Sequence, residues 1–267
     1  RIRKAHVEVG SGSSAAEETG SSSVDGGTMT EDDVSSPRSS RRSAPERIGA
    51  YAVQGELGEG GFARIFEARD DKTGRTVALK ILKSRVGLSE QLVRRFLREA
   101  RAMAAIEHEN IVRIFHVLDD ESTLGLSMEL IRGRSLAERL KLEGPLTAVE
   151  LARVGIALCR ALAAVHHSGF IHRDIKAENV MEEDGGRIVL MDFGMSRSLS
   201  PEQRVTATGV LVGTPVAMAP EQYEFKDPDE RTDVYGLGCL LWHLAAGSRP
   251  IHGTSMEEIR RKVLAGD

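Results

Sequence analysis

The chain has 267 residues, of which 40% are hydrophobic and 28% are charged, and its formal net charge is −4. This length accommodates one large or two ordinary domains, and the composition is that of a soluble globular protein. The slightly acidic balance argues against a nucleic-acid partner, whose binding surface would be basic.

The cysteines and the apolar stretches indicate where the chain resides. Cys159 and Cys239 lie far apart in apolar surroundings with no CxxC pair, which predicts two buried, reduced thiols in a cytoplasmic protein. The longest apolar stretch, Val234 to Gly247, is too short to cross a bilayer about 30 Å thick. It predicts a buried core helix. No signal peptide is visible, although the first residue is Arg1 rather than a methionine.

The first 47 residues form a different kind of polymer. Residues 10–47 are rich in Ser and Gly and almost free of large apolar side chains. Such a segment buries too little surface to offset the entropy of ordering, so we predict a disordered tail over residues 1–47. Its "SSPRSSRRS" stretch could accept phosphates, but most Ser-rich linkers are only linkers.

Strand patterns dominate residues 51–131. "YAVQGELGEGGFARIFEARD" alternates like two strands around a glycine cluster, and residues 76–83 predict a third strand. A helix is expected from about Ser89 to Ile106. Two more strands are expected in "NIVRIFHVL" and "LGLSMEL".

Helical patterns dominate residues 132–267. Thr147 and Glu150 have the spacing of a capping box, and Gly169 is the expected end of that helix. A small β-rich lobe followed by a larger helical lobe predicts an α+β chain with a cleft between the lobes, where ligands prefer to bind.

The segment "GEGGFA" is a candidate phosphate loop. Glycines let the backbone turn tightly and approach a phosphate closely. A glycine-rich hairpin turn without a ligand explains this segment equally well, and its position between two strands excludes a dinucleotide fingerprint. The candidate phosphate-binding residues are Gly58, Glu59, Gly60 and Gly61.

Lys80 lies on a strand whose two faces are otherwise apolar, so its ammonium group needs an anion. Glu99 falls within the apolar stripe of the next helix, three residues after Phe96. Because a carboxylate on a buried face is costly unless it is paired, we predict a Lys80–Glu99 ion pair. In the alternative, Lys80 extends its ammonium group to solvent and Glu99 is peripheral.

The segment "IHRDIKAENV" concentrates polar groups between apolar residues. It is followed by a predicted β-hairpin with its turn at residues 184–186, which would place Asn179 within a residue or two of the position opposite Asp192. Their hard oxygens would suit Mg²⁺, beside Asp174 as the base that deprotonates a hydroxyl. Lys176 would neutralise charge on a transferred phosphoryl group.

Six motifs in order resemble the eukaryotic-like (Hanks-type) protein kinases: "GEGGFARI", "VALK", Glu99, "HRDIKAEN", "DFG" and "APE". The resemblance extends from about Tyr51 to Asp267. It implies a bilobal protein-kinase fold with a small β-rich N-lobe (51–131) and a larger, incomplete helical C-lobe (132–267). It also implies transfer of the ATP γ-phosphoryl group, with Mg²⁺, to Ser or Thr hydroxyls. Lys176 and Thr214 are similar to the serine/threonine rather than the tyrosine kinases.

The resemblance assigns the nucleotide site. The glycine loop would cover the phosphates of ATP, with Lys80 at the α- and β-phosphates and Glu99 holding it. Backbone groups from Glu129 to Ile131, the hinge, would bind adenine, with Met128 as gatekeeper. The apolar walls around the adenine ring would be Leu57, Ile65, Ala78 and Met181.

The resemblance also assigns roles in the C-lobe. Asp174 would be the catalytic aspartate and Asn179 and Asp192 the metal ligands. His172 would be structural, in an apolar stack with Met103, Ile114 and Phe193. Asp233 would anchor the backbone of the catalytic loop. The regulatory residues would be Thr206 and Thr208, phosphorylated in the activation segment, and Arg173, which would bind the phosphate.

Three departures from the kinase pattern concern Ala63, Ala177 and the end of the chain. Ala63 replaces the third glycine of the loop, and Ala177 replaces a common proline. The chain stops at Asp267, before the helices that carry the arginine partner of Glu221, so we expect an apolar surface on the helix at Val234–Gly247 and poor folding.

Other functions and partners stay open. A pseudokinase scaffold on the same fold is the main alternative, and an aminoglycoside-type small-molecule kinase is a third. The expected partners are protein substrates and a second copy of the chain for trans-autophosphorylation, with no nucleic acid. A membrane anchor beyond Asp267 would place the protein at the cytoplasmic face of a membrane.

Overall fold

The computed structural model describes residues 45–61, 63–83, 88–120, 123–192 and 218–266. The chain divides into two units, Arg1–Arg42 and Ser43–Asp267, and all described residues belong to the second. Most of the predicted tail therefore lies outside the described residues. Among the described helices, none combines the length and apolar character that a bilayer span requires.

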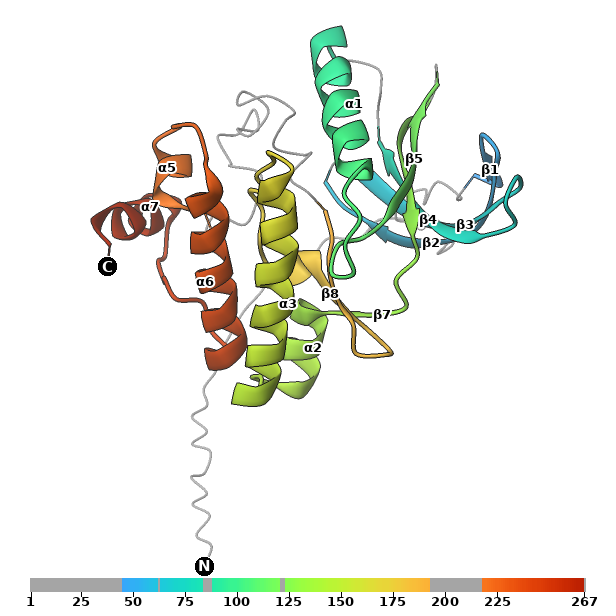
Figure 1. Ribbon diagram of the computed structural model, residues 1–267. Coiled ribbons are helices and arrows are strands. Elements are labelled where there is room, and N and C mark those ends of the chain that lie inside the picture. Colours follow the sequence, from blue (N-terminus) through green and yellow to red (C-terminus); the bar gives the residue numbers. More distant parts are fainter. Residues whose placement is uncertain (1–44, 62, 84–87, 121–122, 193–217, 267) are drawn as a thin grey trace, which may run out of the picture. The chain divides into compact units, whose positions relative to one another are not determined.

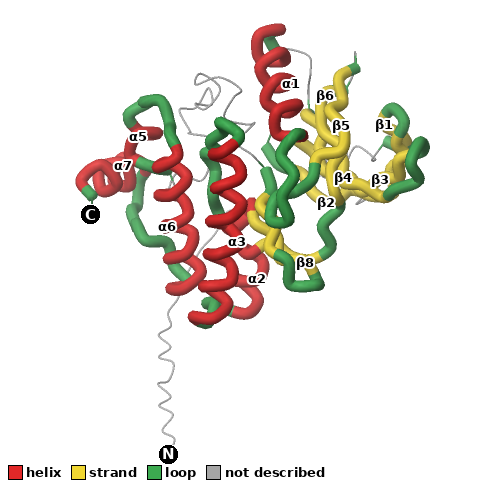
Figure 2. The backbone as a smooth tube through the Cα atoms, in the orientation of Figure 1, coloured by secondary structure: helices red, strands yellow, loops and turns green. Residues whose placement is uncertain are grey.

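The first lobe is built on a six-stranded antiparallel sheet in the order β1-β2-β3-β4-β6-β5 (Figures 1 and 2). The five predicted strands are present, and the additional strand β1 begins inside the segment predicted as tail. The strands are β1 (Arg47–Ile48), β2 (Tyr51–Glu59), β3 (Ala63–Asp70), β4 (Thr76–Leu82), β5 (Ile114–Asp119) and β6 (Leu124–Glu129).

Helix α1 (Glu90–Ala104) packs against β5 (Figure 1). It begins at Ser89, whose hydroxyl accepts a hydrogen bond from the backbone N–H of Leu92. Its apolar side chains Phe96, Ala100 and Met103 are buried, as the helical spacing predicts. Glu99 lies on the same helix and is half-buried.

The predicted strand "NIVRIFHVL" starts later than expected because its first residues bind another strand. The backbone N–H of Leu190 donates to the carbonyl of Asn110 at 2.8 Å, and that of Val112 donates to Leu190 at 3.0 Å. The Asn110 side chain also donates to the carbonyl of Ile188 at 2.8 Å. The loop between α1 and β5 is therefore attached to the second lobe.

The second lobe combines helices with a small antiparallel sheet in the order β7-β8-β9. The predicted capping box is confirmed, since Thr147 and Glu150 bond each other's backbone N–H at the start of α3. The elements are β7 (Gly133–Ser135), α2 (Leu136–Glu143), α3 (Ala148–His167), the 3₁₀ turn η1 (Ala177–Asn179), β8 (Val180–Glu183), β9 (Ile188–Leu190), α5 (Pro220–Tyr223), α6 (Glu230–Ala246) and α7 (Met256–Ala265).

Helix α6 is a core helix on one side only. It packs against α3 and buries Leu237, Leu240 and Leu244. Val234 and Trp242 of the same helix are exposed.

The prediction of two buried thiols is wrong for Cys159, which is exposed, whereas Cys239 is half-buried; both are free. The reason is that α3 directs Leu158 and Leu162 inward, so that position 159 faces outward.

Replacing Gly125 with alanine is expected to destabilise the first lobe. A Cβ at this position would lie inside the van der Waals contact distance of the Lys80 carbonyl oxygen on neighbouring β4. Overpacking of this kind costs about 1–3 kcal/mol of unfolding free energy. Gly238→Ala on α6 is the matched control, because its Cβ would meet no atom within 4 Å. Urea unfolding should show the loss for Gly125→Ala alone; equal midpoints would contradict the clash.

Candidate active site

The predicted catalytic loop, residues 171–180, is anchored to α6 by one buried carboxylate. Asp233 accepts hydrogen bonds from the backbone N–H groups of His172 and Arg173, each at 2.7 Å. Its side chain has no solvent exposure, and His166 of α3 also bonds it, Nε2 to Oδ2, at 2.8 Å. The predicted anchoring role of Asp233 is thereby confirmed. The sequence analysis did not identify His166 as a partner of Asp233. The available signal was its position in the last turn of α3, seven residues before Arg173.

His172 is a structural residue of this loop, as predicted. Its ring is fully buried, with Nε2 2.9 Å from the carbonyl of Met191 and Nδ1 3.3 Å from the backbone N–H of Asp174. A ring that donates through Nε2 and accepts through Nδ1 is neutral. Burial lowers the pKa of His172, which favours the same neutral form.

Asp174, Lys176 and Asn179 form one cluster in the loop. The ammonium group of Lys176 lies 2.9 Å from Asp174 Oδ2. The amide of Asn179 donates to the same oxygen and to the Asp174 carbonyl, at 2.9 Å each. Because the amide nitrogen of Asn179 is committed to Asp174, its Oδ1 is the atom available to a cation.

The predicted hairpin brings the two candidate metal ligands together. Val180 pairs with Leu190, and the backbone N–H of Met191 donates to the carbonyl of Asn179 at 2.8 Å. Asn179 therefore lies opposite Met191, one residue from Asp192, and the turn lies at the expected residues 184–186. Asp192 has φ 47°, in the left-handed region that non-glycine residues rarely adopt, and such backbone outliers concentrate at functional sites.

The predicted Lys80–Glu99 ion pair is wrong for this structure. Lys80 Nζ lies 2.5 Å from Asp192 Oδ1, and Glu99 Oε1 lies 3.0 Å from Nε of Arg95 on its own helix. Lys80 does need an anion, as its apolar surroundings indicated, but the carboxylate comes from the end of the hairpin. The spacing along α1 identified Glu99 as an acid on the apolar face of the helix. It did not reveal that Arg95, four residues earlier on the same helix, would bind this acid instead of Lys80.

Apolar residues of both lobes meet where the adenine ring was expected. Met128, Ile131 and Ala78 are buried in one cluster, against which Ile65 and Met181 pack. Leu57 differs, because it lies at a bulge of β2 and is 51% exposed. The cluster thus contains the predicted gatekeeper, the end of the hinge and three of the four predicted walls.

Glycines 58, 60 and 61 are not required by packing within the protein. A Cβ at Gly58 or Gly61 would meet no atom within 4 Å, and one at Gly60 would meet only the carbonyl of Ala63, at 3.7 Å. Among the described residues, the glycines with positive φ lie elsewhere. These glycines leave open space, as a close approach of phosphate requires.

A match to the family model described as the protein kinase domain covers residues 51–266. The chain belongs to the protein kinase family. This kinase is 36% identical over 217 residues to the serine/threonine-protein kinase PknL of Mycobacterium tuberculosis, which covers 81% of this chain and 54% of PknL. Over 231 residues it is 36% identical to PkaA of Streptomyces coelicolor, covering 81% of the kinase and 42% of PkaA.

A third relative of the kinase is the probable serine/threonine-protein kinase PknB of Corynebacterium glutamicum. It is 35% identical over 210 residues, which are 77% of this chain and 32% of that protein. The kinase therefore spans about a third to a half of the length of these relatives. The bilobal α+β fold expected from the motifs is confirmed by the family and by the arrangement of sheet and helices.

Some predicted residues lie outside the described part of the kinase: Phe193 of the apolar stack, Thr206, Thr208 and Thr214. Met103 and Ile114 share one core cluster, but the stack with Phe193 stays a prediction. Glu221 of "APE" accepts a hydrogen bond from the Thr232 hydroxyl.

Proposed function

We propose that this kinase transfers the γ-phosphoryl group of ATP to Ser and Thr hydroxyls of proteins, with Mg²⁺ as the metal. The observation that carries the proposal is the cluster of Asp174, Lys176 and Asn179 in one loop, next to a hairpin whose end brings Asp192 to Lys80 of the first lobe. Family membership and relatives named serine/threonine-protein kinases support it.

The residues present fit a magnesium-bound nucleotide. Asn179 and Asp192 supply an amide and a carboxylate oxygen, and Mg²⁺ binds through one or two such groups together with phosphates. The bound metal would neutralise charge on the phosphates. The Lys80–Asp192 contact holds the lysine ammonium next to this site, where it would bind the α- and β-phosphates.

Asp174 would act on the acceptor hydroxyl. Its carboxylate is held by Lys176 and Asn179, so it would orient the hydroxyl for in-line attack and accept its proton. Lys176 would stabilise charge on the moving phosphoryl group, since its ammonium already lies at the acidic cluster. Backbone groups at Glu129 and Ile131 would bind the adenine edge.

An acceptor comparison tests the proposed function. Purified protein with Mg²⁺ and labelled ATP should label Ser and Thr of a generic basic protein and leave aminoglycosides unlabelled. Nucleotide binding without transfer would favour the pseudokinase scaffold. Transfer to the small molecule alone would favour the small-molecule kinase and contradict our proposal.

Phosphorylation of Thr206 or Thr208 is expected to regulate the kinase. Arg173 offers a binding partner, because its Nε is buried and makes no hydrogen bond within the described residues, and its backbone has φ 67°. A phosphothreonine would supply the missing acceptor. Mass spectrometry after incubation with Mg·ATP should find phosphate on one or both threonines. A fully active, unmodified enzyme would contradict this regulation.

A further inference from the structure

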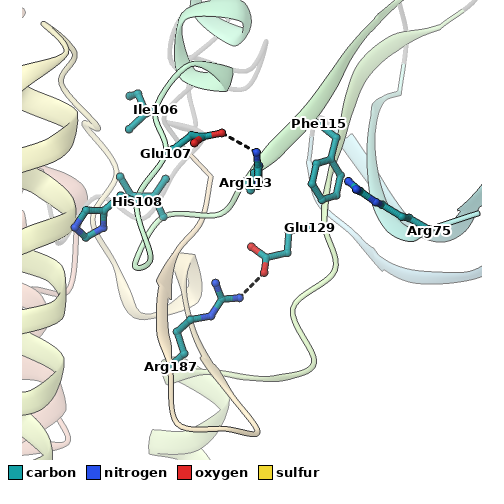
Figure 3. A pocket seen from close by; sticks show the side chains of 9 residues that line it. Arg75, Ile106, Glu107, His108, Arg113, Phe115, Glu129 and Arg187 are labelled. Carbon is teal, nitrogen blue, oxygen red and sulfur yellow. Dashed lines mark hydrogen bonds and ion pairs between the residues drawn. The ribbon is translucent and has the colours of Figure 1, made fainter. Parts of the chain in front are cut away.

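Arg187, at the turn of the β8–β9 hairpin, contacts three separate segments. Its NH2 lies 2.5 Å from Glu129 Oε1 (Figure 3). Its Nε lies 3.0 Å from Glu183 Oε2. Its NH1 also donates to the carbonyl of Glu109, at 3.4 Å, in the loop between α1 and β5. One guanidinium group therefore joins the hairpin to the hinge and to the first lobe.

Among the contacts of Arg187, only the one with Glu183 lies within the hairpin. Glu183 lies on the same hairpin, four residues from Arg187, and already balances the charge of the guanidinium group. The contact with Glu129 adds no charge balance to the hairpin, but it connects the second lobe to the last residue of β6. Glu129 is otherwise held in the sheet, where it pairs with Val77 of β4 and its backbone N–H donates to the carbonyl of Arg113 at 2.8 Å.

The ion pair joins two elements that reach opposite ends of the proposed nucleotide site. Glu129 begins the hinge, whose backbone would bind adenine. The hairpin that carries Arg187 starts directly after Asn179 and ends just before Asp192, the two candidate metal ligands. A nucleotide has to reach from the hinge to these ligands. The ion pair thus connects the two structural elements whose separation the nucleotide must match.

We propose that Arg187 is a positioning residue that holds the hinge, through Glu129, at the separation from the metal ligands that a magnesium-bound nucleotide requires. The inference rests on the proposed function, because it takes the nucleotide site as assigned above. It predicts that loss of the pair weakens the binding of ligands that contact both ends of the site and leaves unchanged the binding of ligands that contact the hinge alone. Preorganisation of this kind acts on affinity by reducing the cost of ordering the site.

The surroundings of the pair allow it to be replaced without damage to the core. Arg187 and Glu129 line an open cavity of about 500 Å³, with Arg113 and Phe115 on its other side (Figure 3). The two side chains of the pair are 30% and 29% exposed. Glutamine at either position would therefore remain solvated rather than create a buried void.

Arg153 provides a matched control on the same hairpin. Its guanidinium group bonds Glu182 and the carbonyl of Gly186, so it too ties a carboxylate and the turn of the hairpin, but from α3. Arg153→Gln removes a comparable cation and breaks contacts within the second lobe only. It reports any effect of loosening the hairpin without disconnecting the hinge.

The test compares the binding of adenosine and of Mg·ADP by titration calorimetry to the wild-type chain, Arg187→Gln, Glu129→Gln and Arg153→Gln. We expect the first two variants to bind Mg·ADP about fivefold more weakly, on the scale of a half-exposed ion pair, and adenosine within about twofold of wild type. Arg153→Gln should match wild type for both ligands.

Each other outcome overturns the inference. Mg·ADP affinity of Arg187→Gln equal to that of Arg153→Gln would show that the link to the hinge does not matter. Equal losses of affinity for adenosine and Mg·ADP would indicate local damage to the adenine site instead of a changed separation between the hinge and the metal ligands. Because the readout is nucleotide binding, it is independent of the acceptor assay. Failure of the wild-type chain to transfer phosphate would count against the proposed function alone.

Discussion

Replacing Asp174 with asparagine is expected to lower the rate of phosphoryl transfer by about a thousandfold or more. The substitution keeps the shape of the side chain but removes the carboxylate that would accept the proton of the substrate hydroxyl. It also removes the negative charge that holds Lys176 at 2.9 Å. Proton transfer and the positioning of reacting groups each contribute about two to four orders of magnitude to a rate. Single-turnover transfer from labelled ATP to a basic protein measures the effect.

The control for this prediction is Asp184→Asn, which alters an exposed acid at the hairpin turn. It should leave the transfer rate unchanged, and both variants should bind Mg·ADP much as the wild-type chain does. If Asp174→Asn retained a near-normal kcat, the assignment of Asp174 as the base would be wrong. If it lost nucleotide binding as well, the residue would serve the metal site rather than the acceptor.

Replacing Asp233 with alanine is expected to lower the free energy of unfolding by about 3–5 kcal/mol and to abolish transfer. The buried carboxylate accepts hydrogen bonds from two backbone N–H groups of the catalytic loop and from His166. Without it, these donors lose their acceptor, and unsatisfied buried groups cost about 1–3 kcal/mol each. The loop that carries Asp174 would then lose its defined conformation.

Asp229→Ala is the matched control, because Asp229 is the exposed N-cap of the same helix. It removes a capping bond without exposing the catalytic loop, so its cost should be clearly smaller. Urea unfolding followed by circular dichroism compares the two variants. A cost for Asp233→Ala no greater than that for Asp229→Ala would show that the loop is held by other contacts.

Local patterns in the sequence determined most of the secondary structure of this kinase. Alternation predicted β4 with Val77 and Leu79 on one face, and these residues share a buried cluster. The spacing of Thr147 and Glu150 predicted the start of α3, since a capping box is closed by neighbours in the chain. The turn at residues 184–186 likewise brought Asn179 and Asp192 together, because a tight turn fixes the register of its strands.

The choice of partners for charged side chains was decided only by the tertiary structure. The sequence indicated that Lys80 needs an anion, but it did not show which acid of the chain supplies it. Lys80 binds Asp192, 112 residues away, while Glu99 binds Arg95 on its own helix. Long side chains reach several partners at similar cost, so small differences in backbone position select among them. The same holds for Arg187 and Glu129, which lie 58 residues apart and meet only because the two lobes fold against the hinge.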